Sequence, residues 1–303
     1  MDDKELFEFV GKEELQIKEF VRPSVSYWSD AWRRLKKNRF AMIGLVLIII
    51  LIVFAIIGPI ISPYEYDQTD LNNVYAPMSW KHIFGTDELG RDVLTRVLYG
   101  ARISLAVGFV ASFLNLIIGV IYGGISGYLG GRVDNIMMRI VDILYSVPIL
   151  LIVILLMVVL RPGLTNVFIA LGIAYWVGMA RIVRGQVLSL KEQEFTLAAK
   201  ALGADKKRIL LKHLIPNTIG PIIITATLLI PDAIFFESFL SFIGLGVSAP
   251  MASWGVLASD GVRAFRSHPN LFLVPSLFIC ITMLSFNFLG DGLRDSLDPR
   301  LRK

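Results

Sequence analysis

EFTLAAKALGADKKRILLKHLIPN, residues 194–217, lies between two apolar segments and constrains how the rest of the chain can be arranged. It carries seven charged side chains, too many for a segment inside a bilayer, so it must project into water. Four apolar side chains share the i, i+3, i+4, i+7 spacing of one helix face: Phe195, Ala198, Ala199 and Leu202. Gly203 is the expected end of that helix, and Asp205 the expected N-cap of a second short one. Helices this short are not stable alone, so the apolar face and basic rim predict a surface that docks on a partner.

The remainder of the chain has the composition of a membrane protein, with 55% hydrophobic and 18% charged residues and a mean hydropathy of +0.65. About 20 apolar residues in a helix cross a hydrocarbon core of ~30 Å. Six windows free of Asp, Glu, Lys and Arg reach or approach that length: Phe40–Ser62, Ile103–Gly131, Ile143–Leu160, Pro162–Ala180, Leu214–Pro231 and Pro269–Gly290. We therefore predict an all-α polytopic membrane protein with six transmembrane helices. Pro59 and Pro63 are expected to end the first span, and Pro148 to kink the third.

The basic residues predict the orientation. With the N-terminus inside, 23 of the 30 Lys and Arg residues fall on cytoplasmic segments, as the positive-inside rule requires. Both termini and residues 194–217 are then cytoplasmic. The net charge of +5 is thus explained by topology and does not indicate nucleic acid as a partner.

Several segments carry local expectations. In the external loop, Gly85 and Gly90 predict tight turns. Its charged residues are expected to pair with one another, in preference to forming a calcium loop, whose spacing they lack: Asp87, Glu88, Arg91 and Asp92. Five glycines of the second span predict close helix packing: Gly108, Gly119, Gly123, Gly124 and Gly127. Arg139 and Asp142 can pair at i, i+3, and the loop 240–270 is expected to hold a short re-entrant or interfacial helix anchored by Trp254.

The fifth span contains two acids, Asp232 and Glu237, and ionisable groups at membrane depth usually face a cavity or a partner. Two interpretations stay open: they line a substrate pathway, or they hydrogen-bond neighbouring helices and hold the bundle together. Asn287 in the sixth span is a third candidate for the pathway.

The chain lacks the usual signatures of an enzyme. It has no G-x-x-x-x-G-K-[ST] phosphate loop, no G-x-S-x-G and no H-E-x-x-H. Its three histidines are far apart in sequence and none is near a cysteine, so we expect no metal site and no cofactor: His82, His213 and His268. Asp142 and Asp232 are the only candidates for an intramembrane two-acid site, and they are predicted toward opposite membrane faces. The single cysteine, Cys280, cannot form an intrachain disulfide and is expected to be a small core residue.

Residues 197–217 resemble the EAA loop of binding-protein-dependent ABC importers, whose pattern is E-A-A-x3-G-x9-I-x-L-P. Four residues match it at the right spacing: Ala198, Ala199, Gly203 and Pro216. Leu197 stands in place of the Glu, His213 in place of the Ile and Ile215 in place of the Leu. Glu194 lies one helical turn before Leu197 and can partly substitute for the missing acid.

Four further stretches extend the resemblance over nearly the whole chain after residue 22: FGTDELGRDVLTRVLYGARISL (84–105), DNIMMRIVDILYSVP (134–148), FLSFIGLGVSAPMASWG (239–255) and GDGLRDSLDPRLR (290–302). They are similar to the C-type permease subunits of oligopeptide and dipeptide ABC importers. The resemblance implies a type I importer permease fold, MetI-like, in the bacterial cytoplasmic membrane. It divides the chain into a cytoplasmic tail (1–39), a first helix with an external loop (40–97), a permease core (98–290, with the coupling loop 190–217) and a second cytoplasmic tail (291–303).

The same resemblance implies partners and roles. A second permease chain would complete a heterodimer in membrane lipid, two ATPase subunits would each receive one coupling loop, and an extracytoplasmic peptide-binding protein would deliver substrate. The coupling residues would be Glu194, Ala198, Ala199, Gly203, Asp205, His213 and Pro216. Import of nickel or another small solute is the alternative within transport. A membrane scaffold or receptor that signals through an ATPase-like partner, and an intramembrane hydrolase, are the alternatives from other classes.

Overall fold

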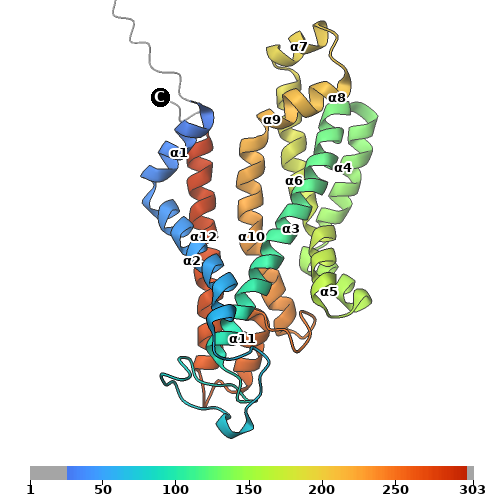
Figure 1. Cartoon of the computed structure of the whole chain (residues 1–303). Coiled ribbons are helices and arrows are strands. Elements are labelled where there is room, and N and C mark those ends of the chain that lie inside the picture. Colours follow the sequence, from blue (N-terminus) through green and yellow to red (C-terminus); the bar gives the residue numbers. More distant parts are fainter. Residues whose placement is uncertain (1–25, 299–303) are drawn as a thin grey trace, which may run out of the picture.

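The computed structural model describes residues 26–298, and the ends of both predicted tails lie outside them. Five long helices dominate the fold (Figure 1): α2 (Arg39–Ile61), α3 (Val93–Leu129), α6 (Leu164–Lys191), α10 (Ile219–Phe242) and α12 (Asn270–Leu297). A sixth span is divided between α4 (Gly131–Ser146) and α5 (Ile149–Leu160), which meet at an angle of 85°. Pro148 lies at this break, because it lacks the N–H that would continue α4. Five of the six predicted spans are therefore continuous helices, the third is a bent pair of helices, and the predicted kink is a sharp bend.

The shorter elements gather at the two ends of the bundle. One end carries α1 (Tyr27–Lys37), α7 (Glu194–Ala201), α8 (Lys206–Arg208), a π-helical segment η3 (Ile209–Leu214) and α9 (Ile215–Asn217). The opposite end carries the loop between α2 and α3, with its short 3-10 turn η2 (Leu71–Asn73), and α11 (Trp254–Arg263). The region predicted to dock on a partner and the predicted external loop thus lie at opposite ends of the molecule.

Pro59 does not end the first span, contrary to the prediction. It lies inside α2, which continues to Ile61. Pro59 has no N–H to donate to the carbonyl of Ala55, four residues earlier. Arg102 of α3 supplies that donor: its Nε lies 2.7 Å from the Ala55 oxygen, and one Nη lies 2.7 Å from the Ile56 oxygen. A side chain from another helix therefore lets α2 tolerate this proline.

Four other helices differ in extent from the predicted windows and boundaries. The fifth span begins at Ile219 and runs through Pro231 to Phe242, so it includes both acids that the window left outside. α12 continues to Leu297, beyond the predicted start of the tail at residue 291, and α6 continues to Lys191, beyond Ala180. α3 begins at Val93, so the predicted boundary at 97/98 falls inside one continuous helix. A window ends at the first charge, whereas a helix continues wherever packing or water accommodates that charge.

Close packing of α3 on α6 forms the centre of the bundle, as its glycines predicted. A Cβ at Gly123 would lie 2.3 Å from the carbonyl oxygen of Ala180, and one at Gly119 would lie 2.5 Å from the Cβ of Met179. Gly108 makes a similar approach to α10, where a Cβ would lie 2.9 Å from Ile230. Small residues let the backbones come this close, which gives dispersion contact in the absence of a hydrophobic driving force in lipid.

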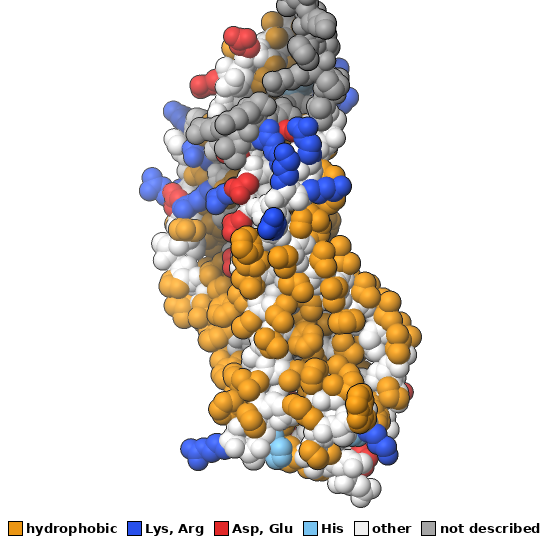
Figure 2. All heavy atoms as spheres, turned by 90° about the vertical axis from the view of Figure 1, so that its left-hand side faces the viewer, with side chains coloured by type: hydrophobic (Ala, Val, Ile, Leu, Met, Phe, Trp, Pro, Cys, Tyr) orange, Lys and Arg blue, Asp and Glu red, His pale blue; other side chains and the backbone are white. Residues whose placement is uncertain are grey.

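The outer face formed by α1, α2 and α12 is apolar over most of its height, and its Lys and Arg residues gather mainly toward the α1 end (Figure 2). Large side chains such as Phe40, Ile57 and Ile61 are exposed on α2. Soluble proteins do not expose apolar surface on this scale, so this belt is the lipid-facing surface. Cys280 of α12 is also exposed, which corrects the expectation of a core position, because residue size does not determine which helix face points inward.

Candidate coupling surface

The projecting loop is anchored to the bundle at the point where α6 ends. Lys191 donates from Nζ to the carbonyl of Tyr128 at the end of α3, at 2.6 Å. The hydroxyl of Thr196 donates to the Leu190 carbonyl at 2.8 Å, and Thr196 is fully buried. The Thr196 bond attaches the first turn of α7 to the end of α6, and the Lys191 bond attaches that end of α6 to the end of α3, so motion of α7 is coupled to α3 through α6.

The turn after α7 has the geometry that the sequence predicts. Gly203 has φ +81°, a left-handed conformation that ends a helix and that side chains rarely adopt. Nothing lies within 4 Å of the place where its Cβ would be, so the backbone conformation alone requires glycine. Asp205 then caps α8, accepting a hydrogen bond from the Arg208 N–H at 3.1 Å. Both predictions about the turn are confirmed.

The apolar stripe of α7 is divided between two directions. Ala199 is buried against the chain's own helices, in a cluster that includes Val183 and Val187 of α6. Phe195, Ala198 and Leu202 are exposed, and Leu202 retains 88% of its accessible surface. The expectation that all four form one docking face is therefore wrong for Ala199. The other three form the apolar surface available to a partner, and Leu197 is exposed on another side of α7.

The second arm of the loop is packed firmly. Ile209 and Leu214 of η3 are buried in the same cluster as Ala199. His213 is half-buried, and its carbonyl accepts a hydrogen bond from the Asn217 side chain at 2.6 Å. Pro216 is exposed in α9, and Glu194 and Asp205 are also exposed. The loop is therefore a rigid projection with an apolar outer side.

Glu237 lies at the junction of α3, α10 and α11 and has no exposed surface. Its carboxyl accepts hydrogen bonds from the hydroxyls of Ser104 at 3.0 Å and Ser241 at 2.8 Å. Ser104 also accepts from the backbone N–H of Trp254 at 3.2 Å, which attaches the start of α11 to this centre. Trp254 donates its ring N–H to the Val97 carbonyl at 3.0 Å and is fully buried. The short helix predicted at Trp254 exists, and Trp254 anchors it in the protein core.

The other two pathway candidates lie in a different environment. Asp232 of α10 and Asn287 of α12 are both exposed, and neither side chain makes a hydrogen bond within the described part of the chain. The two acids of the fifth span therefore differ: Glu237 holds three helices together, whereas Asp232 is available to water or a ligand. No pattern within the fifth span separated them, since their environments depend on the rotation of α10 in the bundle.

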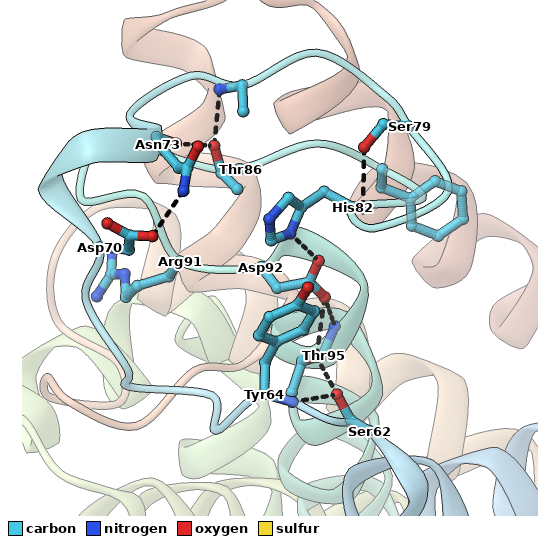
Figure 3. A network of polar contacts seen from close by, with 12 residues as sticks. Ser62, Tyr64, Asp70, Asn73, Ser79, His82, Thr86, Arg91, Asp92 and Thr95 are labelled. Carbon is cyan, nitrogen blue, oxygen red and sulfur yellow. Dashed lines mark hydrogen bonds and ion pairs between the residues drawn. The ribbon is translucent and has the colours of Figure 1, made fainter.

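The external loop folds over the start of α3 through a polar network (Figure 3). Asp92 caps α3 by accepting from the N–H and the hydroxyl of Thr95, each at 2.8 Å. Its other oxygen lies 3.0 Å from Nδ1 of His82, and the His82 ring stacks on Tyr64 at 4.9 Å. Ser62, at the end of α2, lies 2.5 Å from the Thr95 hydroxyl. The network ties the end of the first span to the second.

A second group of charges on this loop pairs only partly as predicted: Asp87 pairs with Arg91, whereas Asp92 pairs with His82, and Glu88 is exposed and forms no ion pair within residues 26–298. Asp87 accepts from Arg91 at 2.8 Å and also from Arg96, which lies 3.7 Å from Asp260 of α11. Gly85 and Gly90 have φ +77° and +72°, as expected for tight turns. Burial raises the pKa of Asp260, while Arg96 acts in the opposite direction. Because Asp87 and Asp92 are occupied by cations and by the cap of α3, we interpret this part of the loop as a structural platform.

The predicted ion pair between Arg139 and Asp142 on α4 is wrong. Asp142 pairs with Arg181 of α6 at 2.6 Å instead of with Arg139. Asp134 binds Arg184 through both oxygens at 2.6 Å, and it also accepts from Ser126 at 2.6 Å. The ion pairs form between α4 and α6 and not within α4, because the packing of these two helices brings Asp142 close to Arg181 and Asp134 close to Arg184.

Together these features define a polytopic membrane protein with a rigid projection for a partner at one end and a folded platform at the other. Comparison with known proteins identifies its family. A model of the binding-protein-dependent transport system inner membrane component matches residues 115–303. A model of the N-terminal TM domain of oligopeptide transport permease C matches residues 26–77. The chain belongs to this family of inner membrane transport components.

Individual relatives cover almost the whole chain. The chain is 57% identical to the dipeptide transport system permease protein DppC of Bacillus subtilis (strain 168), over 93% of this chain and 88% of that one. It is 53% identical to the oligopeptide transport system permease protein OppC of the same organism, over 99% and 98%. Among solved structures, the inward-facing MetNI methionine ABC transporter matches with a TM-score of 0.54 and 19% identity, over 74% of this chain and 99% of that one. The fold is that of a type I ABC importer permease, MetI-like.

Proposed function

We propose that this chain is a permease subunit of an ATP-driven importer that moves dipeptides or oligopeptides into the cytoplasm. The observation that carries the substrate class is the identity of 57% and 53% to dipeptide and oligopeptide permeases over nearly the full length. In this proposal a second permease chain completes the pathway as a heterodimer. Two ATPase subunits supply the energy by ATP hydrolysis, and an extracytoplasmic binding protein delivers the peptide to the end that carries the external loop.

The coupling step would begin at the outer face of α7. In this proposal an ATPase covers Phe195, Ala198 and Leu202, whose exposed apolar surface has no cover from the chain itself. Closure of the two ATPases on ATP would displace α7, and the bonds of Lys191 and Thr196 would carry the movement into α3 and α6. Packed helices move as rigid bodies, so the bundle would tilt between inward-open and outward-open states. This direction requires α7 to be cytoplasmic, as the charge distribution predicts.

A bulky substitution on the docking face tests this role. In transporter reconstituted with all partners, Ala198→Trp should lower peptide-stimulated ATP hydrolysis by at least about tenfold, the effect of ~1.4 kcal/mol of lost interaction. The thermal stability of the isolated chain should stay unchanged, because Ala198 is exposed. Lys200→Trp, an equally bulky change at an exposed position away from this face, serves as the control. Full peptide-stimulated hydrolysis in Ala198→Trp would refute the docking assignment. If the reconstituted wild-type transporter takes up nickel and no peptide, the substrate is nickel and the proposed peptide substrate is wrong.

We further propose that Asp232 and Asn287 line the pathway, because both are polar, exposed and without partners in the described chain. A carboxylate in the pathway attracts the free ammonium group of a peptide. Asp232→Asn should therefore reduce uptake of peptides with a free amine more than uptake of N-acetylated peptides. Equal losses for both substrates would contradict a charge-based role.

A further inference from the structure

A polar recess lies between α4 and α6, outside the packed core of the bundle. Its volume is about 670 Å³, and six residues line it: Asn135, Met138, Arg139, Asp142, Arg181 and Arg184. Its α4 residues lie along the middle of that helix, from Asn135 to Asp142. Neither the coupling face nor the pathway candidates include these residues.

The recess and its wall contain one more cation than anion. Arg184 is neutralised by both oxygens of Asp134, and Arg181 is paired with Asp142. Arg139 is exposed and forms no ion pair within residues 26–298. A cation at the edge of a bilayer without an acidic partner attracts an anion. The carboxylates orient the other two arginines, so Arg139 is the cation available to bind it.

The polar recess continues directly into an apolar one. A second hollow shares Asn135 and Arg139 with the first, and its remaining lining is Ile136 and Ile140. These isoleucines are exposed, Ile136 to 65%, and Val133 and Ile143 extend the same apolar strip along α4. A small soluble anion would leave this strip uncovered, whereas an amphiphile with an anionic head and a hydrocarbon tail would fill both hollows.

Aromatic side chains place the recess at the level of lipid headgroups. The guanidinium of Arg181 lies 4.0 Å from the centre of the Tyr145 ring. Tyr122 packs on Trp176 at 4.6 Å, next to Met138 and Val141 beneath the recess. Tyr and Trp concentrate where the hydrocarbon core meets the headgroups, with the apolar ring inward and the polar tip outward.

We propose that the recess between α4 and α6 binds an anionic phospholipid. Arg139 and Arg181 contact the headgroup phosphate, and one acyl chain lies along Ile136 and Ile140. The proposal concerns a lipid bound at the protein surface and does not depend on which substrate is transported.

The test uses the purified full-length chain in detergent, titrated with phosphatidylglycerol or phosphatidylcholine of the same acyl composition and followed by native mass spectrometry. Wild type should bind phosphatidylglycerol more tightly. Arg139→Gln should reduce that affinity about fivefold, the effect of ~1 kcal/mol for one basic residue near a lipid headgroup, and leave phosphatidylcholine binding unchanged. Arg139→Lys, which keeps the charge, should retain most of the preference. Arg161→Gln, the same charge change at an exposed position at the far end of α5, should have no effect.

Three outcomes would overturn the proposal. One is the same preference for phosphatidylglycerol in wild type and Arg139→Gln. Another is displacement of phosphatidylglycerol by millimolar inorganic phosphate, which would define a site for a free anion. The third is displacement by a dipeptide through its carboxylate, which would assign the recess to the transport pathway. Arg139 is exposed and without ion pairs in the described chain, so its variants should fold normally.

Discussion

Replacing Glu237 by alanine should destabilise the bundle strongly, whereas replacing it by glutamine should have a small effect. The carboxyl is fully buried and accepts two hydrogen bonds, from Ser104 and Ser241. Alanine leaves both hydroxyls buried without their acceptor. Each buried unsatisfied polar group costs about 1–3 kcal/mol, so the loss amounts to about 2–6 kcal/mol before any cavity term.

Glutamine keeps the size of the side chain and one carbonyl oxygen. Its amide nitrogen cannot accept a hydrogen bond, so one serine hydroxyl must rotate and accept from it instead. A hydroxyl has two acceptor lone pairs and can do so, even though Ser104 already accepts from Trp254. We expect a cost of about 1 kcal/mol, the net worth of one hydrogen bond.

The measurement is the thermal unfolding of the full chain in one detergent. About 1 kcal/mol shifts the midpoint by ~2–4 °C for chains of a comparable size. Glu237→Ala should therefore lower the midpoint by at least about 4 °C, and Glu237→Gln by no more than about 4 °C. Asp232→Ala is the control, because it removes an exposed carboxylate from the same helix and should leave the midpoint within about 1 °C. A midpoint for Glu237→Ala equal to that of wild type would refute the structural role, as would equal losses for Ala and Gln.

Two further predictions concern helix packing. Gly123→Ala should cost about 1–3 kcal/mol, because its Cβ would lie 2.3 Å from the Ala180 carbonyl. Gly124→Ala, whose Cβ would meet only the ends of two side chains, the nearer at 3.3 Å, should be tolerated; equal unfolding midpoints for the two variants would contradict the packing. Arg102→Met should destabilise the chain, because the Arg102 side chain donates to the Ala55 carbonyl in place of the N–H that Pro59 lacks. Pro59→Ala restores a backbone N–H and should reduce the loss in the double variant, whereas additive losses in a double-mutant cycle would exclude this compensation.

Sequence patterns were most informative where the outcome depends on how well each side chain is solvated by water or by lipid. The six apolar windows predicted the spans, and the charge of residues 194–217 predicted the projection. Gly203 and Asp205 were also predictable, since a helix end and an N-cap depend on a few neighbouring residues. The cytoplasmic orientation and the division of the chain at residues 39, 97 and 290 stay predictions.

Contacts between distant segments could not be predicted in the same way. The sequence allowed Asp142 to pair with Arg139, but the fold pairs it with Arg181, because α4 packs on α6. It placed Ala199 on the docking face, but that side chain turns toward its own bundle.

The amino-acid sequence by itself determined which segments can enter a bilayer and which must stay in water, because the hydration of each side chain and peptide group acts locally. Only the tertiary structure decided that Glu237 is a buried link among three helices while Asp232 is exposed. It also decided that Arg102 supports α2 at Pro59. These roles depend on the rotation of each helix and on partners that are 46 to 150 residues away along the chain. Those relations arise only when the helices pack.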